Sequence, residues 1–392
     1  MSECGVKEFK LCELLKIYNG TKYDHLNKGD IPLYGSGGLM SHVNEALYSG
    51  EAILLPRKGT LSNIMYVNES FWTVDTMYYA VVNDKLADAF YLYSYLSQLD
   101  LSNLDSGSTL PSMTKSAYES IVVKLPDLKI QKAVATILFN IRKKLEINNQ
   151  INQELEAMAK TLYDYWFVQF DFPDQNGKPY KSSGGKMVYH PELKREIPEG
   201  WGVAKVEDIA QTGSGGTPKS TNVSYYSNGE IPWINSGELE QTVITSTSNF
   251  ITEEGLNNSS AKLFPSGTIL VAMYGATAGK VSFLTFEAST NQAICAIMLN
   301  DIRMRYYLKN VIEDLYQYLV KLSTGSARDN LSQDMIKNIK VVIPSNDILD
   351  RYYDFSNNII KEITKKQQEN EQLTQLRDWL LPMLMNGQVK VE

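Results

Sequence analysis

The chain has 392 residues, of which 43% are hydrophobic and 21% charged, and its net charge is −7. This length suffices for two domains with connecting helices. An acidic balance is unusual for a nucleic-acid-binding protein, so any basic surface must be local. No run of eighteen apolar residues occurs, and the first residues, MSECGVKEFK, lack the apolar stretch of a secretory signal. We therefore expect a soluble cytoplasmic protein.

Metal-binding and disulfide patterns are missing from the sequence. The cysteines and histidines are few and scattered, with no paired spacing: Cys4, Cys12, Cys295, His25, His42 and His190. Such a set is typical of reduced structural thiols and argues against a zinc site or a disulfide framework. We expect no bound metal.

The second half of the chain repeats the first. Residues 105–126 (DSGSTLPSMTKSAYESIVVKLP) resemble residues 323–344 (STGSARDNLSQDMIKNIKVVIP) at a constant offset of 218 positions. Earlier segments also match, with small length differences: KGDIPLYGSGGL (28–39) with NGEIPWINSGEL (228–239), and ILLPRKG (53–59) with ILVAMYG (269–275). Two long copies are too few for a solenoid. The repeat predicts pseudo-twofold symmetry, although duplication without functional symmetry is the alternative.

The first globular unit, residues 1–125, contains short apolar runs separated by turn residues. ILLP (53–56), YYAVVN (78–83) and IVVKLP (121–126) are typical of buried strands, whereas DAFYLYSYLSQL (88–99) is typical of a helix. We predict a mixed α/β domain.

A long helix is predicted over residues 126–168, and its copy over 344–382. Apolar residues recur at heptad spacing in matched positions of both segments: Val134, Ile137, Ile141, Leu145, Leu155, Met158 and Leu162 in the first, and Tyr352, Phe355, Ile359, Ile363, Leu373, Leu376 and Leu380 in the second. Pseudo-twofold symmetry favours an antiparallel coiled-coil pair that acts as a rigid spacer. Near its middle, Asn148 and Asn152 match Lys366 and Asn370; they would either fix the helix register or lie on an ordinary solvated stretch.

Residues 169–200 are rich in Gly, Pro and Lys and are predicted to be a linker without strands. They contain a nuclease-like pattern in which Asp174 and Glu192 could hold a metal while Lys194 orients the attacking water. A linker is the favoured interpretation because nothing in the segment would hold the two carboxylates together.

The second globular unit, residues 201–343, repeats the α/β pattern, and residues 383–392 form a tail. TILVAMYG (268–275), ICAIML (294–299) and IKVVIP (339–344) predict strands, and RMRYYLKNVIEDLYQYL (303–319) predicts a helix. GATAGKVS (275–282) and GSGGTPKS (213–220) approach a phosphate-binding loop but break its spacing. No catalytic triad or amino-methyltransferase tetrapeptide is found, so the chain is predicted to lack its own chemistry.

Several segments carry a family resemblance that covers essentially the whole chain. LYDYWFVQFDFPDQNGKPYKSSGGKMV leading to IPEGW, GGTPKS, IPWINSGEL, TGSARDNLSQDMI and the closing LRDWLLPMLMNGQVKVE resemble the specificity subunit of a Type I restriction-modification system. The resemblance implies a non-catalytic DNA-reading subunit. Each of two target recognition domains would read one half of a bipartite double-stranded DNA site, and the helices would set the unread spacer.

The resemblance also implies partners and where the cofactors belong. Two methyltransferase subunits would dock on this chain and methylate an adenine in each half-site, and restriction subunits would join for cleavage. S-adenosylmethionine, ATP and Mg²⁺ are expected on those partners, and no cofactor is expected on this chain. Two other interpretations remain open: a coiled-coil scaffold that binds proteins only, and a metal-dependent nuclease.

Candidate DNA contacts follow from residue type. Cations could contact phosphates, and short polar or aromatic side chains could contact base edges. In the first domain these are Lys22, Lys28, Tyr34, Ser36, Arg57 and Lys58; in the second, Thr217, Lys219, Ser220, Asn235, Ser236, Tyr274, Lys280 and Arg328. The glycines at matched positions (Gly37 and Gly237, Gly59 and Gly275, Gly107 and Gly325) are interpreted as turns. GGTPKS finds no counterpart in IYNGTKYDHL, so the two half-sites should differ in sequence.

Overall fold

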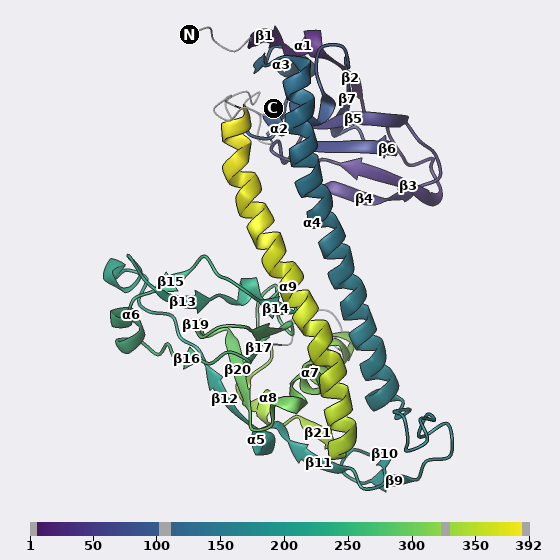
Figure 1. Cartoon of the computed structure of the whole chain (residues 1–392), viewed down its shortest axis with the longest axis vertical. Helices are drawn as coiled ribbons and strands as arrows, with labels where there is room; N and C mark the ends of the chain where they lie inside the picture. The colour runs from purple at the N-terminus through teal and green to yellow at the C-terminus, as the bar shows by residue number, and fades with distance from the viewer. Residues whose placement is uncertain (1–5, 102–110, 323–329, 386–392) are drawn as a thin grey trace. The chain divides into compact units, whose positions relative to one another are not determined.

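The computed structural model describes residues 6–101, 111–322 and 330–385 (Figure 1). The chain forms two compact units, Met1–Glu146 with Gln372–Glu392, and Ile147–Glu371. Two long helices, α4 (Leu128–Tyr163) and α9 (Asn346–Met385), each contribute residues to both units. The five-residue π-helix η2 (Asp164–Val168) continues α4.

The first unit contains a six-stranded sheet in the order β2-β7-β5-β6-β3-β4. All neighbours in it are antiparallel except β3 and β6, which pair in parallel through Leu33↔Trp72 and Tyr34↔Thr73. The strands are β2 (Leu15–Asn19), β3 (Lys28–Gly35), β4 (Gly38–Val43), β5 (Tyr48–Pro56), β6 (Met65–Thr73) and β7 (Met77–Val82).

The remaining elements of the first unit close the domain onto the helices. They are β1 (Lys7–Lys10), α1 (Leu11–Leu14), α2 (Ala89–Leu96), α3 (Lys115–Glu119) and β8 (Val122–Leu125), with β1 and β8 paired antiparallel. Asp88 caps α2 by accepting a hydrogen bond from the Tyr91 amide at 2.9 Å. The apolar core of the unit includes α2, Leu138 of α4 and Leu384 of α9, so the two long helices share this core.

The second unit contains two sheets and a longer helix. A five-stranded sheet has the order β12-β20-β17-β18-β14, and a four-stranded sheet the order β15-β13-β19-β16. The strands are β12 (Ala210–Ser214), β13 (Ile231–Ile234), β14 (Val243–Ile244), β15 (Phe250–Ile251), β16 (Leu263–Phe264), β17 (Ile269–Ala272), β18 (Val281–Leu284), β19 (Ala288–Thr290) and β20 (Ile294–Leu299). The other elements are β11 (Gly202–Lys205), α5 (Val206–Ile209), η3 (Val223–Tyr225), η4 (Ser236–Glu238), α6 (Glu253–Asn257), η5 (Ile302–Met304), α7 (Arg305–Leu322), α8 (Gln333–Lys337) and β21 (Lys340–Ile343).

The two units share a topology, as the repeat predicts. Strand order β2-β7-β5-β6 in the first corresponds to β12-β20-β17-β18 in the second. Each domain is closed by an antiparallel pair of its first and last strands, Lys7↔Leu125 and Gly202↔Ile343. The strands and helices expected from the apolar runs are confirmed in both copies. The predicted fold class, duplicated α/β domains with long helices, is confirmed.

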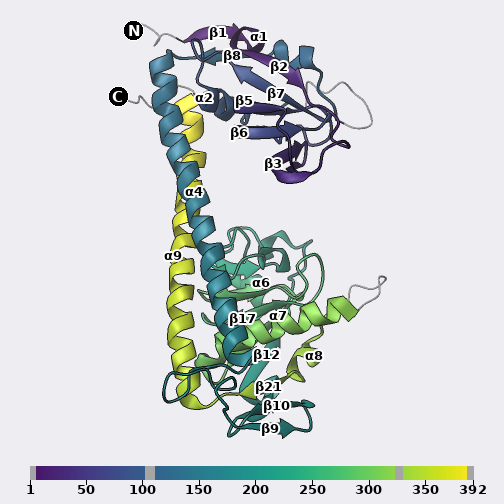
Figure 2. The ribbon, with the colours of Figure 1, turned by 90° about the vertical axis from the view of Figure 1, so that its right-hand side faces the viewer.

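The long helices run antiparallel, and each unit contains part of their contact (Figure 2). In the second unit Trp166 packs on Tyr352, and farther along Asn148 hydrogen-bonds Asn370. The buried or half-buried positions follow alternating spacings of four and three residues: Val134, Leu138, Ile141, Leu145, Asn148, Asn152, Leu155 and Ala159 in α4, and Tyr352, Ser356, Ile359, Ile363, Lys366, Asn370 and Leu373 in α9.

Part of the predicted apolar seam is wrong. Met158, Phe355 and Leu376 are 53%, 42% and 42% exposed. Each lies three heptads from another predicted seam residue, and this spacing preserves a helix face without telling which face is buried. The buried face of each helix instead includes Leu138 and Ser356, which lie four residues after Val134 and Tyr352.

Residues 169–200 form a structured segment, so the expectation that it lacks strands is wrong. β9 (Met187–His190) and β10 (Arg195–Pro198) form an antiparallel hairpin. The segment is part of the second unit, and its Phe172 stacks on Tyr180 within the segment and on Trp201 beyond it, at centroid distances of 4.7 and 4.8 Å.

The carboxylates of the nuclease-like pattern have separate structural partners. Asp174 Oδ1 accepts hydrogen bonds from the amides of Asn176 and Lys178, both at 2.8 Å. Glu192, in the hairpin turn, pairs with Lys340 at 3.1 Å. Among residues 6–101, 111–322 and 330–385, no group of three or more His, Cys, Asp and Glu side chains could hold a metal. The nuclease interpretation loses its geometric basis.

Candidate nucleic-acid interface

Four loops meet at one place in the first domain, following β2, β3, β5 and β6. The Thr21 amide donates to the Thr73 carbonyl at 2.8 Å, and the Val74 amide donates to the Tyr34 carbonyl at 3.0 Å. Gly20 permits this approach, because a Cβ there would lie 2.0 Å from the Val74 carbonyl oxygen. The loops are thus held together mainly through their backbones.

The second domain makes the same contacts. The Gly216 amide donates to the Thr290 carbonyl at 2.8 Å, and the Asn291 amide donates to the Ile234 carbonyl at 2.9 Å. Gly215 takes the place of Gly20, because a Cβ on it would lie 2.1 Å from Thr290 Oγ1. The expectation that GGTPKS has no counterpart in the first domain is therefore wrong. The counterpart is the Gly20–Thr21 turn, which the different lengths of the following loops hide in the sequence.

The loop after β5 and its copy after β17 have matching turns. Gly59 and Gly275 adopt φ angles of 89° and 91°, which favour glycine, so their interpretation as turns is confirmed. In each domain a polar side chain of this loop donates a hydrogen bond to the turn that follows β3 or its copy β13. Asn63 Nδ2 donates to the Ser36 carbonyl at 2.9 Å, and Thr277 Oγ1 donates to the Ser236 carbonyl at 2.7 Å.

In both domains a tryptophan donates a hydrogen bond to the loop that follows β2 or its copy β12. The two tryptophans lie on strands that are not equivalent. Trp72 on β6 donates through Nε1 to the Thr21 carbonyl at 3.1 Å. Trp233 on β13 donates through Nε1 to the Gly216 carbonyl at 3.0 Å. The same hydrogen bond to this loop thus occurs in both copies, although the tryptophan that donates it lies on β6 in one and on β13 in the other.

We call each such set of four loops a loop cluster: residues 20–22, 35–40, 57–63 and 74–76 in the first domain, and 215–217, 235–240, 273–279 and 291–292 in the second.

Four of the six candidate residues of the first domain lie in its loop cluster: Lys22, Ser36, Arg57 and Lys58. Lys22 and Lys58 are exposed, and Arg57 Nη1 donates to the Asp75 carbonyl at 3.3 Å. Tyr34 Oη donates to Glu69, and burial, followed by this bond, raises the pKa of Tyr34 to about 12. Lys28 begins β3 and so lies at the other end of that strand from Ser36.

In the second domain Thr217, Asn235, Ser236 and Tyr274 belong to the loop cluster, and Lys219 and Ser220 follow it as exposed residues. Thr217 Oγ1 hydrogen-bonds Gln292 Oε1, and Asn291 Nδ2 donates to Asn235 Oδ1 at 3.4 Å. Lys280 is exposed just beyond the cluster, and Arg328 lies outside the described residues. Sequence reasoning missed Asn63, Thr277, Asn291 and Gln292, whose side chains hydrogen-bond within the loop clusters; different loop lengths hide these contacts in the sequence.

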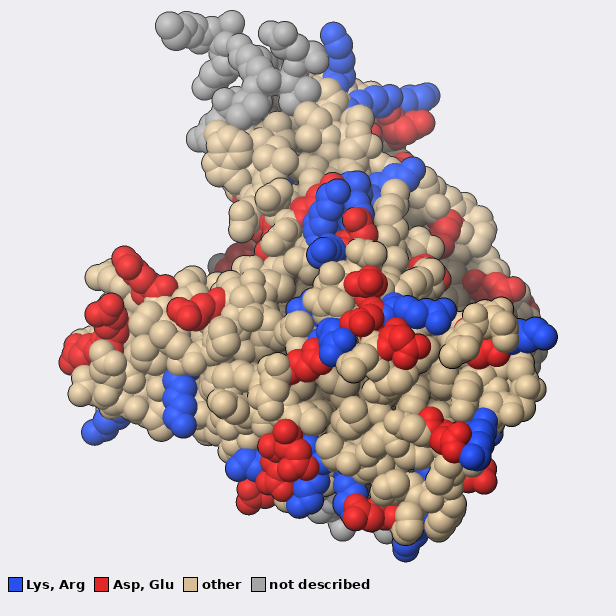
Figure 3. Space-filling view, turned by 60° about the horizontal axis from the view of Figure 1, so that its bottom comes forward, with Lys and Arg blue, Asp and Glu red and all other residues tan. Residues whose placement is uncertain are grey.

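The two loop clusters carry opposite charge balances, the first basic and the second acidic. Lys and Arg are mixed with Asp and Glu over the face in Figure 3, which fits the acidic net charge. The first cluster carries Lys22, Arg57 and Lys58 against Asp75, whereas the second carries Glu238 and Glu240. Phosphate contacts would therefore depend on a few placed cations.

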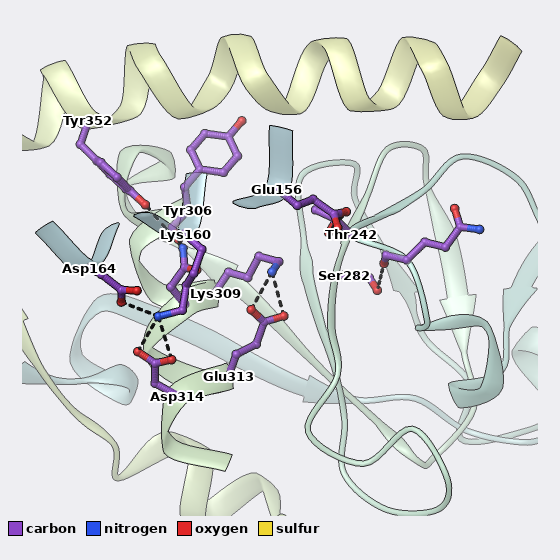
Figure 4. A network of polar contacts seen from close by, with 12 residues as sticks. Glu156, Lys160, Asp164, Thr242, Ser282, Tyr306, Lys309, Glu313, Asp314 and Tyr352 are labelled. Atoms are coloured by element: carbon purple, nitrogen blue, oxygen red, sulfur yellow. Dashed lines mark hydrogen bonds and ion pairs between the residues drawn. The ribbon is translucent and has the colours of Figure 1, made fainter. Parts of the chain in front are cut away.

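The second domain is seated on α4 and α9 by polar contacts around a cavity of about 410 Å³ (Figure 4). Thr242 Oγ1 donates to Glu156 of α4 at 2.6 Å, and Lys160 of α4 pairs with Asp314 of α7 at 3.1 Å. Burial alone would lower the pKa of Lys160, but its bonds to Asp164 and Asp314 outweigh that and raise the pKa. Lys160 and Lys309 are paired with carboxylates and Glu156 accepts from Thr242, so the cavity wall serves to hold the domain on the helices.

The chain matches one family model over most of its length, described as the Type I restriction modification DNA specificity domain. The match covers residues 4–157 and 198–375, one segment in each copy of the repeat. No helix within the described part of the chain is long and apolar enough to cross a membrane.

Curated relatives and a solved structure agree with this match. The chain is 27% identical over 297 residues to the Type I restriction enzyme MjaIX specificity subunit of Methanocaldococcus jannaschii, covering 74% of this chain and 66% of that protein. It is 27% identical over 333 residues to the HindI specificity subunit of Haemophilus influenzae, covering 72% of each. The crystal structure of a Type I restriction-modification S subunit from M. genitalium superposes with a TM-score of 0.63 at 14% identity, covering 98% of this chain and 97% of that one, and shows the same fold.

Proposed function

The chain belongs to the Type I restriction modification DNA specificity family, and we propose that it is the subunit that gives such a system its DNA sequence specificity. Its two domains each present a loop cluster with the same backbone contacts. Each cluster would read one half of a bipartite double-stranded site. The chain itself would perform no chemistry.

The observation that carries this proposal is that the scaffold repeats and the side chains do not. The Gly20 and Gly215 contacts, the Gly59 and Gly275 turns, and the bonds to Ser36 and Ser236 recur. The side chains around them differ, as in Val74 against Asn291. This pattern suits two readers of one mechanism whose base contacts differ, because base contacts specify a sequence while the scaffold sets position.

The partners follow from the proposed role. Two methyltransferase subunits would dock on the chain and modify an adenine in each half-site, and restriction subunits would join them. S-adenosylmethionine, ATP and Mg²⁺ would be held by those partners. Since α4 and α9 each contribute to both units, their length would set the unread spacer between half-sites.

The test is co-expression of the chain with the methyltransferase subunit of its own system, in a host without adenine methylation. Modified adenines are mapped by single-molecule sequencing, with and without this chain. We expect a bipartite motif that disappears when the chain is omitted. An unchanged motif, or no motif, would contradict the proposal and favour a protein-binding scaffold.

A further inference from the structure

The first loop cluster exposes two large apolar side chains in succession, Leu39 and Met40. They are 56% and 52% exposed. The pairing of β3 with β4 shifts register here, from Leu33↔Ser41 to Tyr34↔Leu39, so Met40 is the extra residue of a β-bulge. Bulges re-aim side chains and are common beside functional sites. The bulge turns Met40 over Gly35, where a Cβ would lie 2.6 Å from Met40 Sδ.

The second loop cluster exposes no apolar side chain at the two equivalent positions. Leu239, the copy of Leu39, is 1% exposed, and Glu240 takes the place of Met40. Asn291 takes the place of Val74. The Val74 amide donates to the Tyr34 carbonyl of β3, and the Asn291 amide donates to the carbonyl of the matched residue of β13, Ile234. The same scaffold therefore presents apolar groups in the first domain and carboxylate and amide groups in the second.

Val74 connects the apolar pair to the cations of the first cluster. A Cβ on Gly35, which lies under Met40, would be 3.4 Å from Val74 Cγ2. Gly20, two residues before Lys22, meets the Val74 carbonyl, and the neighbouring Asp75 carbonyl accepts the hydrogen bond from Arg57. Val74 is 4% exposed, so it links the two groups beneath the surface, and the apolar pair lies beside the part of the domain proposed to meet DNA.

We propose that Leu39 and Met40 read the C5-methyl group of a thymine in the half-site of the first domain. This inference rests on the proposed function. The thymine methyl is the apolar group that base pairs present in the major groove, and aliphatic side chains contact it there. Met40 is half exposed and lies against Gly35, so its side chain is held along the domain surface, which suits contact with a methyl group better than insertion between base pairs. The second domain, with Asn291 and Gln292, would read its half-site by hydrogen bonds.

The test uses the complex with its methyltransferase partner and synthetic duplexes that carry the mapped motif. Deoxyuridine replaces each thymine of one half-site at a time, which removes only the methyl group. Methyl transfer is measured as kcat/KM for the unchanged chain, for Leu39→Asn with Met40→Gln, and for Val122→Gln. Val122 is 53% exposed on β8 and serves as a matched control for loss of surface apolar area.

We expect deoxyuridine at one position of one half-site to lower kcat/KM about fourfold for the unchanged chain and the control. The Leu39, Met40 variant should show that loss already with thymine and no further loss with deoxyuridine. An undiminished deoxyuridine effect in the variant would overturn the proposal, as would a loss in the variant that no deoxyuridine substitution reproduces. The latter result would indicate contact with the base stack. Either way a bipartite motif would leave the proposed function standing, whereas a missing motif would remove both.

Discussion

A cluster of amides at the centre of the helix contact allows a quantitative test of the packing between α4 and α9. Asn148 is fully buried, and its Nδ2 donates to Asn370 at 2.9 Å and to Glu369 at 3.0 Å. Asn370 is 8% exposed and donates to Asn149 at 2.8 Å. All four residues lie in the second compact unit. Asparagine in an apolar seam specifies helix register at a cost in stability.

Replacing Asn148 by Leu should leave the Asn370 side chain partly unpaired in a buried place. The expected cost is about 1–3 kcal/mol, which corresponds to a fall in Tm of roughly 2–12 °C for a unit of this size. Replacing Asn148 and Asn370 together by Leu should restore or raise the Tm, because Glu369 keeps its bond to Lys366 and Asn149 is exposed to water, so no buried polar group is left unsatisfied.

Thermal unfolding followed by circular dichroism measures both effects, and Asn358→Leu is the matched control. Asn358 is an exposed asparagine of α9 in the same unit and should change the Tm by less than about 2 °C. The reasoning is refuted if the double variant melts lower than both single variants. It is also refuted if Asn148→Leu alone leaves the Tm unchanged.

Three further predictions concern the loop scaffold, the thiols and the helices. Gly20→Ala should destabilise the first unit by more than about 3 kcal/mol, because its Cβ would lie 2.0 and 2.4 Å from two backbone carbonyl oxygens. Gly37→Ala is the control: a Cβ there would have no atom within 4 Å, so this variant should melt at the same temperature as the unchanged chain. Iodoacetamide followed by peptide mass spectrometry should label exposed Cys12 in the native protein and buried Cys295 only after unfolding, since burial raises the pKa of Cys295 to about 12; equal labelling would show that the β20 core opens readily. Deleting one heptad from α4 should alter the spacer of the mapped motif or abolish modification while each half-site keeps its sequence; an unchanged spacer would contradict the role given to the helices.

The fold was largely predictable because it is encoded in repeated apolar runs. The apolar runs ILLP in β5 and ILVA in β17 predicted strands, and the similarity of ILLPRKG to ILVAMYG identified the two as equivalents. The phase of the helix seam was not predictable, because Met158 and Leu155 are equally apolar and only the packed partner decides which one is buried.

One difference between the two loop clusters depends on a single position, which is Gly38 in the first domain and Glu238 in the second. GSGGL and NSGEL align, yet the first forms a hairpin turn and the second the short helix η4. Gly38 adopts a φ of 113°, which opens the hairpin, whereas the Glu238 carboxylate accepts a hydrogen bond from the Asn235 amide at 2.8 Å and closes a tight turn. Leu39 is consequently exposed while Leu239 is buried. Alignment of the letters predicts equal positions and cannot give this difference.

The central claim is that each domain independently reads one half of the site, and duplicating one domain tests it most directly. Residues 202–343 are replaced by a second copy of residues 7–125, since the strand pairs Lys7↔Leu125 and Gly202↔Ile343 close the two domains in the same way. Modified adenines are then mapped with the methyltransferase partner. We predict a motif in which the first half-site occurs twice as an inverted repeat. A motif that keeps the original second half-site would contradict the account.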